Sequence, residues 1–196
     1  GSEMCIRDSA IDKMAVSNTE ATVESTVDRV NSDLLDIRQI FDAANYNIVQ
    51  EFDISSEKFA EQFSLLYEVN SDKIESLALY GNEGRLIASE PVAVEKENID
   101  VKGQDWYKNA ESAIENVHFS IPHIQNLYED GLYRYHWVVS LSRYVDINDG
   151  EIPGSGVLLV DMKYSVIEDV LKQINDSSEG IYYYMISRDG QMIYHC

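Results

Sequence analysis

The chain begins with a long stretch in which apolar residues recur every seven positions. Residues 10–50 contain neither glycine nor proline, and acidic or polar residues fill most of the intervening positions. Two apolar series interleave along this stretch, namely Val16, Val23, Val30, Ile37 and Ala44, and Val27, Leu34, Phe41 and Ile48. The pattern predicts one long helix over residues 10–50 with a single apolar seam. The seam either packs on the helix's own domain or pairs with a second copy of the chain.

Shorter elements follow, and their order indicates the class of fold. Apolar periods of about 3.6 and 2 residues distinguish helices from strands, and turn residues separate them. The expected elements are a helix over 56–69, strands over 74–80 and 85–89, a helix over 105–115, strands over 117–121, 133–145 and 155–164, and a helix over 165–174. Alternating βαβ units are absent, so a parallel doubly wound sheet is not expected. The sequence predicts an α+β fold, in which helices flank one antiparallel sheet.

The two ends of the chain differ from its middle. Residues 1–9 (GSEMCIRDS) look like a tag remnant or a translated adaptor, so we expect a non-native leader there. Residues 180–196 predict two strands around Asp189-Gly190, a strong hairpin-turn signal. A lone hairpin is marginally stable in water, so these strands are expected to begin a further unit.

The charge of the chain limits its partners. Its 196 residues include 35 acidic and 15 basic ones, which gives a formal net charge of −20. Nucleic acid is not an expected partner, because phosphate binding needs clustered Lys and Arg. An anionic membrane surface is not an expected docking site for the same reason. The charge serves solubility, or it gives a mild preference for cationic or zwitterionic ligands.

Sequence motifs of enzymes and cofactor sites are absent. The GSG at residues 154–156 lacks a third glycine and precedes a strand, and no P-loop, G-x-S-x-G or H-E-x-x-H motif occurs. The four histidines lack the spacing of metal ligands, and Cys5 and Cys196 stand at opposite ends of the chain. We therefore expect no catalysis, no cofactor and no metal ion in this stretch.

Polar and aromatic residues within apolar strands are the candidates for a binding site. Asp161 follows the apolar run GVLLV, where a carboxylate must be paired, hydrogen-bonded or turned towards a ligand. Strand periodicity puts Tyr133, Tyr135 and Trp137 on one face of their predicted strand. These rings fill a core or line a small-molecule pocket. The same two alternatives apply to the Trp-Tyr pair at 106 and 107, which leads a predicted helix.

Four blocks of the sequence, in this order, resemble the double Cache sensor domain. They are GQDWYKNA, FSIPHIQNLYEDGLYRYHWVVSLSRYV, GVLLVDMKYSVIEDVL and GIYYYMISRDGQMIYH. This domain is the extracytoplasmic part of bacterial sensor histidine kinases and chemoreceptors, and the spacing is most similar to that of kinases from Gram-positive bacteria. The resemblance covers roughly residues 10–195.

The resemblance implies an architecture and a cellular location. The fold would be a PAS-like antiparallel sheet with a long N-terminal helix. Residues 51–176 would form a membrane-distal lobe that binds the ligand, and residues 177–196 would be the truncated start of a membrane-proximal lobe. The chain would lie on the extracytoplasmic side of a cell-membrane protein, most similar to a two-component histidine kinase. The full receptor would form a homodimer through the N-terminal helix.

The resemblance also implies a set of ligand-binding residues. In the amino-acid-binding subclass, an arginine precedes a Trp-Tyr pair by two residues, and an aspartate ends a later strand. Trp106, Tyr107 and Asp161 match this motif, whereas Gln104 replaces the arginine. Glutamine offers one neutral NH₂ where arginine forms two charge-assisted bonds with a carboxylate, which weakens the case for an α-amino acid. The expected ligand is a small polar metabolite, namely an amino acid, an amine or a sugar-like compound. The expected ligand-binding residues are Gln104, Trp106, Tyr107, His123, Tyr135 and Asp161.

Overall fold

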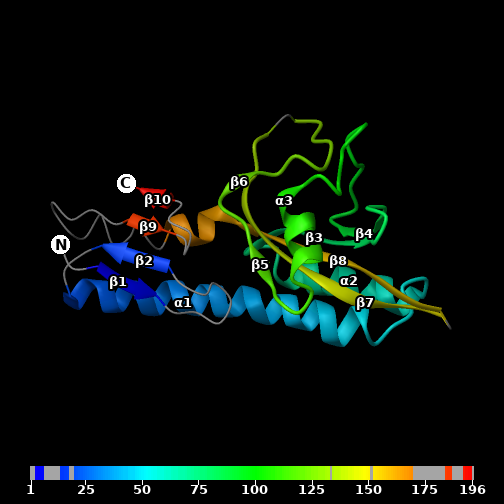
Figure 1. Cartoon of the computed structure of the whole chain (residues 1–196), viewed down its shortest axis with the longest axis horizontal. Helices are drawn as coiled ribbons and strands as arrows, with labels where there is room; N and C mark the ends of the chain where they lie inside the picture. Colours follow the sequence, from blue (N-terminus) through cyan, green and yellow to red (C-terminus); the bar gives the residue numbers. More distant parts are fainter. Residues whose placement is uncertain are drawn as a thin grey trace. The chain divides into compact units, whose positions relative to one another are not determined.

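The structure is a computed structural model that describes residues 3–6, 14–17, 20–132, 134–150, 152–169, 184–186 and 192–195 (Figure 1). The chain divides into two units. The larger unit is Gln39–Lys163, and the other combines Gly1–Arg38 with Tyr164–Cys196. None of the helices in the described part combines the length and the hydrophobicity that a membrane span needs.

An antiparallel sheet of six strands forms the centre of the larger unit. The strands are β3 (Ile74–Gly81), β4 (Leu86–Glu90), β5 (His118–Phe119), β6 (His123–Ile124), β7 (Trp137–Asp149) and β8 (Ile152–Lys163). Their order is β4-β3-β8-β7-β5, and β6 also pairs with β7. Every pairing is antiparallel. The predicted α+β class and its antiparallel sheet are confirmed.

Helices cover both faces of this sheet. Ser142 of β7 donates a hydrogen bond to the carbonyl of Trp106 in α3 (Asp105–Ser112). The next residue, Arg143, donates to the hydroxyl of Tyr46 in the π-helix η1 (Ala43–Val49). Successive side chains of a strand point to opposite faces, so α3 and η1 lie on opposite faces of the sheet.

The helix predicted over residues 56–69 is present as α2 (Glu57–Val69). Ser56 caps it, because its hydroxyl accepts a hydrogen bond from the backbone N–H of Phe59 at 3.1 Å. Phe59 and Phe63 are buried and stack with their ring centroids 5.2 Å apart. α2 contacts η1 and strands β3 and β4, and thus covers the edge of the sheet.

The N-terminal helix begins later than the heptad pattern predicted. Residues 14–17 form the strand β2 (Met14–Ser17), in which Val16 pairs with Met185, and α1 (Glu20–Asp42) begins after it. Extending the helix back to residue 10 was therefore wrong. Ser, Asn and Thr at 17–19 are residue types that favour helix N-caps. The prediction rested on the heptad spacing alone and did not take this signal into account. At its other end α1 continues into η1, and the seam residues Phe41, Ala44 and Ile48 are buried.

The terminal parts of the chain share a second sheet. β1 (Glu3–Ile6), β2, β9 (Tyr184–Ile186) and β10 (Met192–His195) pair in the order β1-β2-β9-β10. β1 comes from the residues that we expected to form a leader outside the fold, and in the structure it pairs with β2. β9 and β10 pair antiparallel as predicted, whereas the Asp189-Gly190 turn lies outside the described residues.

Gly156 of β8 provides a test of the strand packing. A Cβ at this position would overlap the carbonyl oxygen of Tyr80 and lie 2.7 Å from Cδ1 of Ile147. We expect Gly156→Ala to lower the free energy of unfolding by about 1–3 kcal/mol, as overpacked substitutions do. Urea denaturation measures the change.

The matched control is Gly154→Ala on the same strand. Its added Cβ would meet its nearest neighbour at 3.7 Å, an ordinary contact, so stability should not fall. Equal stabilities of the two variants would contradict the close approach of β3 and β8 at Gly156.

Candidate functional site

A row of polar side chains crosses the centre of the larger sheet. Ser76 of β3 and Ser140 of β7 both pair with Asp161 of β8, so the three side chains lie side by side. Ser140 and Ser142 are two residues apart, which puts the row on the face that α3 covers. The three residues are at most 4% exposed, with Asp161 at 1%. A carboxylate is thus enclosed at the middle of an otherwise apolar layer.

Three side chains donate hydrogen bonds to the Asp161 carboxylate. Ser140 Oγ donates to Oδ1 at 2.5 Å, whereas Gln125 Nε2 and Ser76 Oγ donate to Oδ2 at 2.6 and 3.2 Å. Gln125 Nε2 also donates to Ser76 Oγ at 2.8 Å, which an NH₂ group permits because it has two hydrogens. Of the three expected states of Asp161, paired, hydrogen-bonded or turned towards a ligand, the structure shows the hydrogen-bonded one.

His123 extends this network towards the strands at the edge of the sheet. Its Nε2 lies 3.3 Å from Ser140 Oγ. Since the hydroxyl hydrogen of Ser140 is directed to Asp161, His123 Nε2 is the donor in this contact. Its Nδ1 lies 3.2 Å from Ser120 Oγ and 3.0 Å from the carbonyl oxygen of Ile121. His123 is therefore connected to Asp161 through a single hydroxyl group.

The environment of Asp161 opposes its ionisation. Burial raises the pKa of Asp161 above the ordinary value of a carboxyl group. The hydrogen bonds from Ser140 and Gln125 and the charge of His123 act in the opposite direction and offset part of this increase. The carboxylate therefore favours a partner that either bears a positive charge or supplies additional hydrogen bonds.

A cavity of about 690 Å³ opens next to the polar row. Its walls are the start of β3, residues 91–96 after β4, and residues between 124 and 136 before β7. Ser76 and Gln125 line the cavity, whereas Asp161 lies buried behind them. The volume is within the range of small-molecule sites.

Backbone hydrogen bonds join two walls of this cavity to each other. Lys96 N donates to Leu127 O and Glu129 N donates to Val94 O, both at 2.9 Å, and Glu95 bridges Tyr128 in antiparallel fashion. We call these paired segments, residues 94–96 and 127–129, the flap. The hydroxyl of Tyr128 lies 3.1 Å from that of Tyr80, which connects the flap to β3.

Charged side chains close another part of the cavity wall. His136 Nδ1 lies 2.7 Å from Glu75 Oε1, and its Nε2 lies 2.7 Å from Asp130 Oδ2. Arg134 Nε lies 3.2 Å from the same oxygen of Asp130. The hydrogen bond from His136 is the main reason why the pKa of Asp130 lies below its usual range. These contacts connect the segment before β7 to β3.

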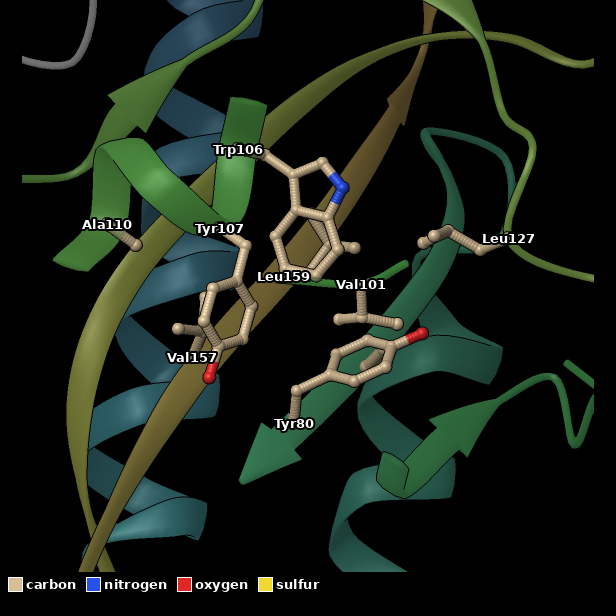
Figure 2. Packing of buried hydrophobic residues seen from close by; sticks show 9 residues of the cluster. Tyr80, Val101, Trp106, Tyr107, Ala110, Leu127, Val157 and Leu159 are labelled. Atoms are coloured by element: carbon tan, nitrogen blue, oxygen red, sulfur yellow. The ribbon is translucent and has the colours of Figure 1, made fainter. Parts of the chain in front are cut away.

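The structure assigns the Trp-Tyr pair to the core rather than to the cavity (Figure 2). Trp106 and Tyr107 point from α3 towards the sheet, and the Trp106 ring lies 5.3 Å from that of Tyr80 and 5.6 Å from that of Tyr107. The Tyr107 hydroxyl donates to the carbonyl oxygen of Gly81 at 2.9 Å. Of the two alternatives for this pair, core or pocket, the structure supports the core, because one turn of α3 presents both rings to the apolar layer.

The other expected ligand-binding residues occupy different positions. Gln104 is the N-cap residue of α3, with its amide 3.4 Å from the carbonyl oxygen of Asp100, and it does not line the cavity. Tyr135 lines the cavity but is 79% exposed. Its expected strand position was wrong, because β7 begins only at Trp137. Tyr133 lies outside the described residues. His123 and Asp161 are thus the two expected residues that the structure brings into one network.

Three residues of the network were missed in the sequence: Ser76, Ser140 and Gln125. For the two serines a signal was present, because Ser76 lies between Ile74 and Ala78 at alternate positions, and Ser140 follows Val138 by two residues in the run WVVSLS. Gln125 follows a strand of two residues, and no periodicity indicates which way its side chain points.

No protein-family model and no curated protein matches the sequence. Solved structures do match it. The ligand-binding domain of the Pseudomonas aeruginosa PAO1 chemoreceptor PctB in complex with L-Gln is 18% identical, with a TM-score of 0.62 over 89% of this chain and 65% of that one. That of the Pseudomonas fluorescens chemoreceptor CtaA in complex with L-alanine is 20% identical, with a TM-score of 0.65 over 88% and 68%. That of the Pseudomonas aeruginosa PAO1 chemoreceptor PctC in complex with GABA is 20% identical, with a TM-score of 0.63 over 88% and 71%.

The chain has the fold of these ligand-binding domains. The PAS-like sensor fold expected from the double Cache resemblance is therefore confirmed. The chain spans about two thirds of the length of the domains that it matches.

The core position of Trp106 predicts a structural role. Trp106→Ala should lower the free energy of unfolding by about 3–5 kcal/mol, because the removed ring leaves a hole among Tyr80, Leu159 and their neighbours. Trp137→Ala is the control, since that side chain is 52% exposed and a smaller loss is expected. Chemical denaturation of both variants measures the difference. A Trp106→Ala variant of unchanged stability would contradict the core assignment.

The raised pKa of Asp161 predicts a pH-dependent stability difference. At a pH below the unfolded pKa of about 3.9 the carboxyl group is protonated in both states. As the pH rises through the higher folded pKa, ionisation of the buried group removes stability from the wild type. Asp161→Asn does not ionise, so its stability relative to wild type should increase with pH.

Guanidinium denaturation midpoints between pH 4 and 8 measure this difference. Asp146→Asn is the control, because Asp146 is an exposed residue of the same sheet. A constant difference between Asp161→Asn and wild type across the pH range would mean that the carboxyl group is not destabilised by burial.

Proposed function

We propose that the chain is the extracytoplasmic ligand-sensing domain of a membrane-anchored signalling receptor, and that a small polar metabolite binds in the cavity beside Asp161. One observation carries this proposal. A buried carboxylate, held by hydrogen bonds from three side chains, lies directly behind a cavity of about 690 Å³. Similar solved domains bind their ligands in the same fold. Ser140 directs its hydroxyl hydrogen to Asp161 and not to His123, so the contacts differ from those of a Ser-His-Asp triad, and the role that we propose is binding.

The proposed ligand is an amino acid, an amine or a sugar-like metabolite. The similar domains were solved with L-Gln, L-alanine and GABA, each of which contains an amino group. Asp161 would accept hydrogen bonds from an ammonium group or from hydroxyl groups. Gln104 lies away from the cavity, so a ligand carboxylate would meet Lys96 or Arg134 instead. Among the described residues no group of His, Cys, Asp and Glu suits a metal ion, and none is part of the proposal.

Signalling would follow from a population shift between two conformations of the domain. A ligand that binds the closed cavity better than the open one increases the closed population. η1 packs against β7 on the sheet face opposite to α3, and it directly continues α1. A displacement of the sheet would thus pass into α1 and along this helix towards the membrane.

We further propose the place of the domain in the receptor. Residues 51–176 would be the membrane-distal lobe and residues 177–196 the start of a membrane-proximal lobe. The first part of α1 would pair with a second copy of the chain. The block spacing favours a two-component histidine kinase as the output. A chemoreceptor is the second candidate, because the similar solved domains come from chemoreceptors.

Ligand binding tests the proposal. A polar-metabolite panel should contain a compound that raises the melting temperature, and at 100 times its Kd it should stabilise the domain by about 2.7 kcal/mol. Asp161→Ala should weaken binding of a charged ligand by about 2–5 kcal/mol, because a buried charge pair is lost. Isothermal titration calorimetry measures this loss.

Asp146→Ala removes an exposed carboxylate of the neighbouring strand and should leave the affinity unchanged. Affinity that is undiminished in Asp161→Ala would place the ligand elsewhere. Chemical turnover of a panel compound would favour an enzyme over a sensor.

A further inference from the structure

We propose that Gln125 is an internal competitor of the ligand: its side-chain amide caps the Asp161 carboxylate in the empty domain, and ligands that bear an ammonium group displace it. This inference rests on the proposed sensing function. It narrows the ligand from three chemical classes to amines and amino acids, and it names the residue that sets this selectivity.

The position of Gln125 is that of a cap between cavity and carboxylate. Its Nε2 lies 2.6 Å from Asp161 Oδ2 and 2.8 Å from Ser76 Oγ. Gln125 and Ser76 both line the cavity, whereas Asp161 is 1% exposed. A donor that enters from the cavity therefore meets the Gln125 amide before it reaches Oδ2.

Gln125 differs from the other two donors in how it is held. Ser76 and Ser140 belong to β3 and β7, and the strand ladders on both sides of β8 fix their positions. Gln125 follows β6, and its backbone N–H is bonded to the carbonyl oxygen of His136 at 2.9 Å. The backbone is thus anchored, while a long side chain reaches the carboxylate through rotatable bonds. The amide can leave Asp161 by a rotamer change without breaking a strand pairing.

The chemistry of the exchange favours a charged donor. A hydroxyl group that replaced the Gln125 amide would exchange one neutral donor for another, with no net gain. An ammonium group forms a charge-assisted hydrogen bond, which is roughly twice as strong as a neutral one. It also brings a positive charge to a carboxylate that burial disfavours. A neutral cap of this kind therefore rejects polyols more strongly than it rejects amines.

The test uses Gln125→Met, which keeps the length of the side chain and removes its donors. The probes are three pairs that differ by an ammonium or a hydroxyl group: L-alanine and L-lactate, serinol and glycerol, and glucosamine and glucose. Calorimetry, or NMR titration for weak binders, measures Kd with the whole chain. For the ammonium member that binds wild type, Kd should fall about tenfold in Gln125→Met, because a hydrogen bond to a charged group no longer stabilises the empty state.

Two further readouts belong to the same experiment. The melting temperature of unliganded Gln125→Met should be lower than that of wild type, since Asp161 loses a donor, and the ligand should restore it. Gln39→Met is the matched control, because Gln39 is an exposed residue of α1, and neither Kd nor melting temperature should change.

The outcomes separate this inference from the function on which it rests. An unchanged or higher Kd in Gln125→Met, with binding still dependent on Asp161, would overturn the competitor role and leave the sensor proposal standing. Tighter binding of the hydroxyl member of a pair to wild type would overturn the selectivity. Absence of binding by every probe to both wild type and Gln125→Met would contradict the amine-sensing function, and the inference with it.

Discussion

The structure of the larger unit depends on the burial of one ionisable group. Asp161 lies in the central strand of the sheet, and an uncompensated carboxylate at that depth would be strongly destabilising. Its compensation comes from three separate parts of the chain: β3, β7, and β6 with the residue that follows it, from which Gln125 bonds the carboxylate directly and His123 contacts it through Ser140. The row of hydroxyl groups therefore requires these elements to be in register. A one-residue slip of either neighbouring strand would turn a serine to the opposite face and remove one of the three donors of the carboxylate.

The face that holds this row is divided into two regions of different character. Beside α3 the layer is apolar and aromatic, with Trp106, Tyr107 and Tyr80 packed on Val157 and Leu159. Beyond the polar row the layer opens into the cavity. The aromatic region supplies rigidity next to the site and does not itself contact the space where a ligand would bind. This division explains how the Trp-Tyr pair can belong to this fold and still serve the core.

Local signals predicted much of the fold, and long-range pairing decided the remainder. Ser56 before two phenylalanines at helical spacing, and the turn between β3 and β4, were sufficient to place α2 and the first hairpin. Asp161 stood out because a charge interrupted an apolar strand. By contrast, β2 is a strand because it pairs with β1 and β9. β9 is remote in the sequence, and β1 lies in the residues that we expected to form a leader outside the fold. The position of Gln125 depends on the pairing of β6 with β7, and the residue at which β7 begins depends on its partner strands. Neither can be predicted from the residues that are neighbours in the sequence.

The pairing within the flap couples the two walls mechanically. Because backbone hydrogen bonds join residues 94–96 to residues 127–129, the two walls cannot swing apart independently without breaking their mutual ladder. The flap is connected to β3 by the Tyr128–Tyr80 contact, and next to it His136 joins Asp130 to Glu75 of the same strand. A displacement of one stretch therefore carries the other with it, although the two lie some thirty residues apart in the sequence. For a ligand held in this cavity, as proposed above, the two stretches would then be displaced together rather than one at a time.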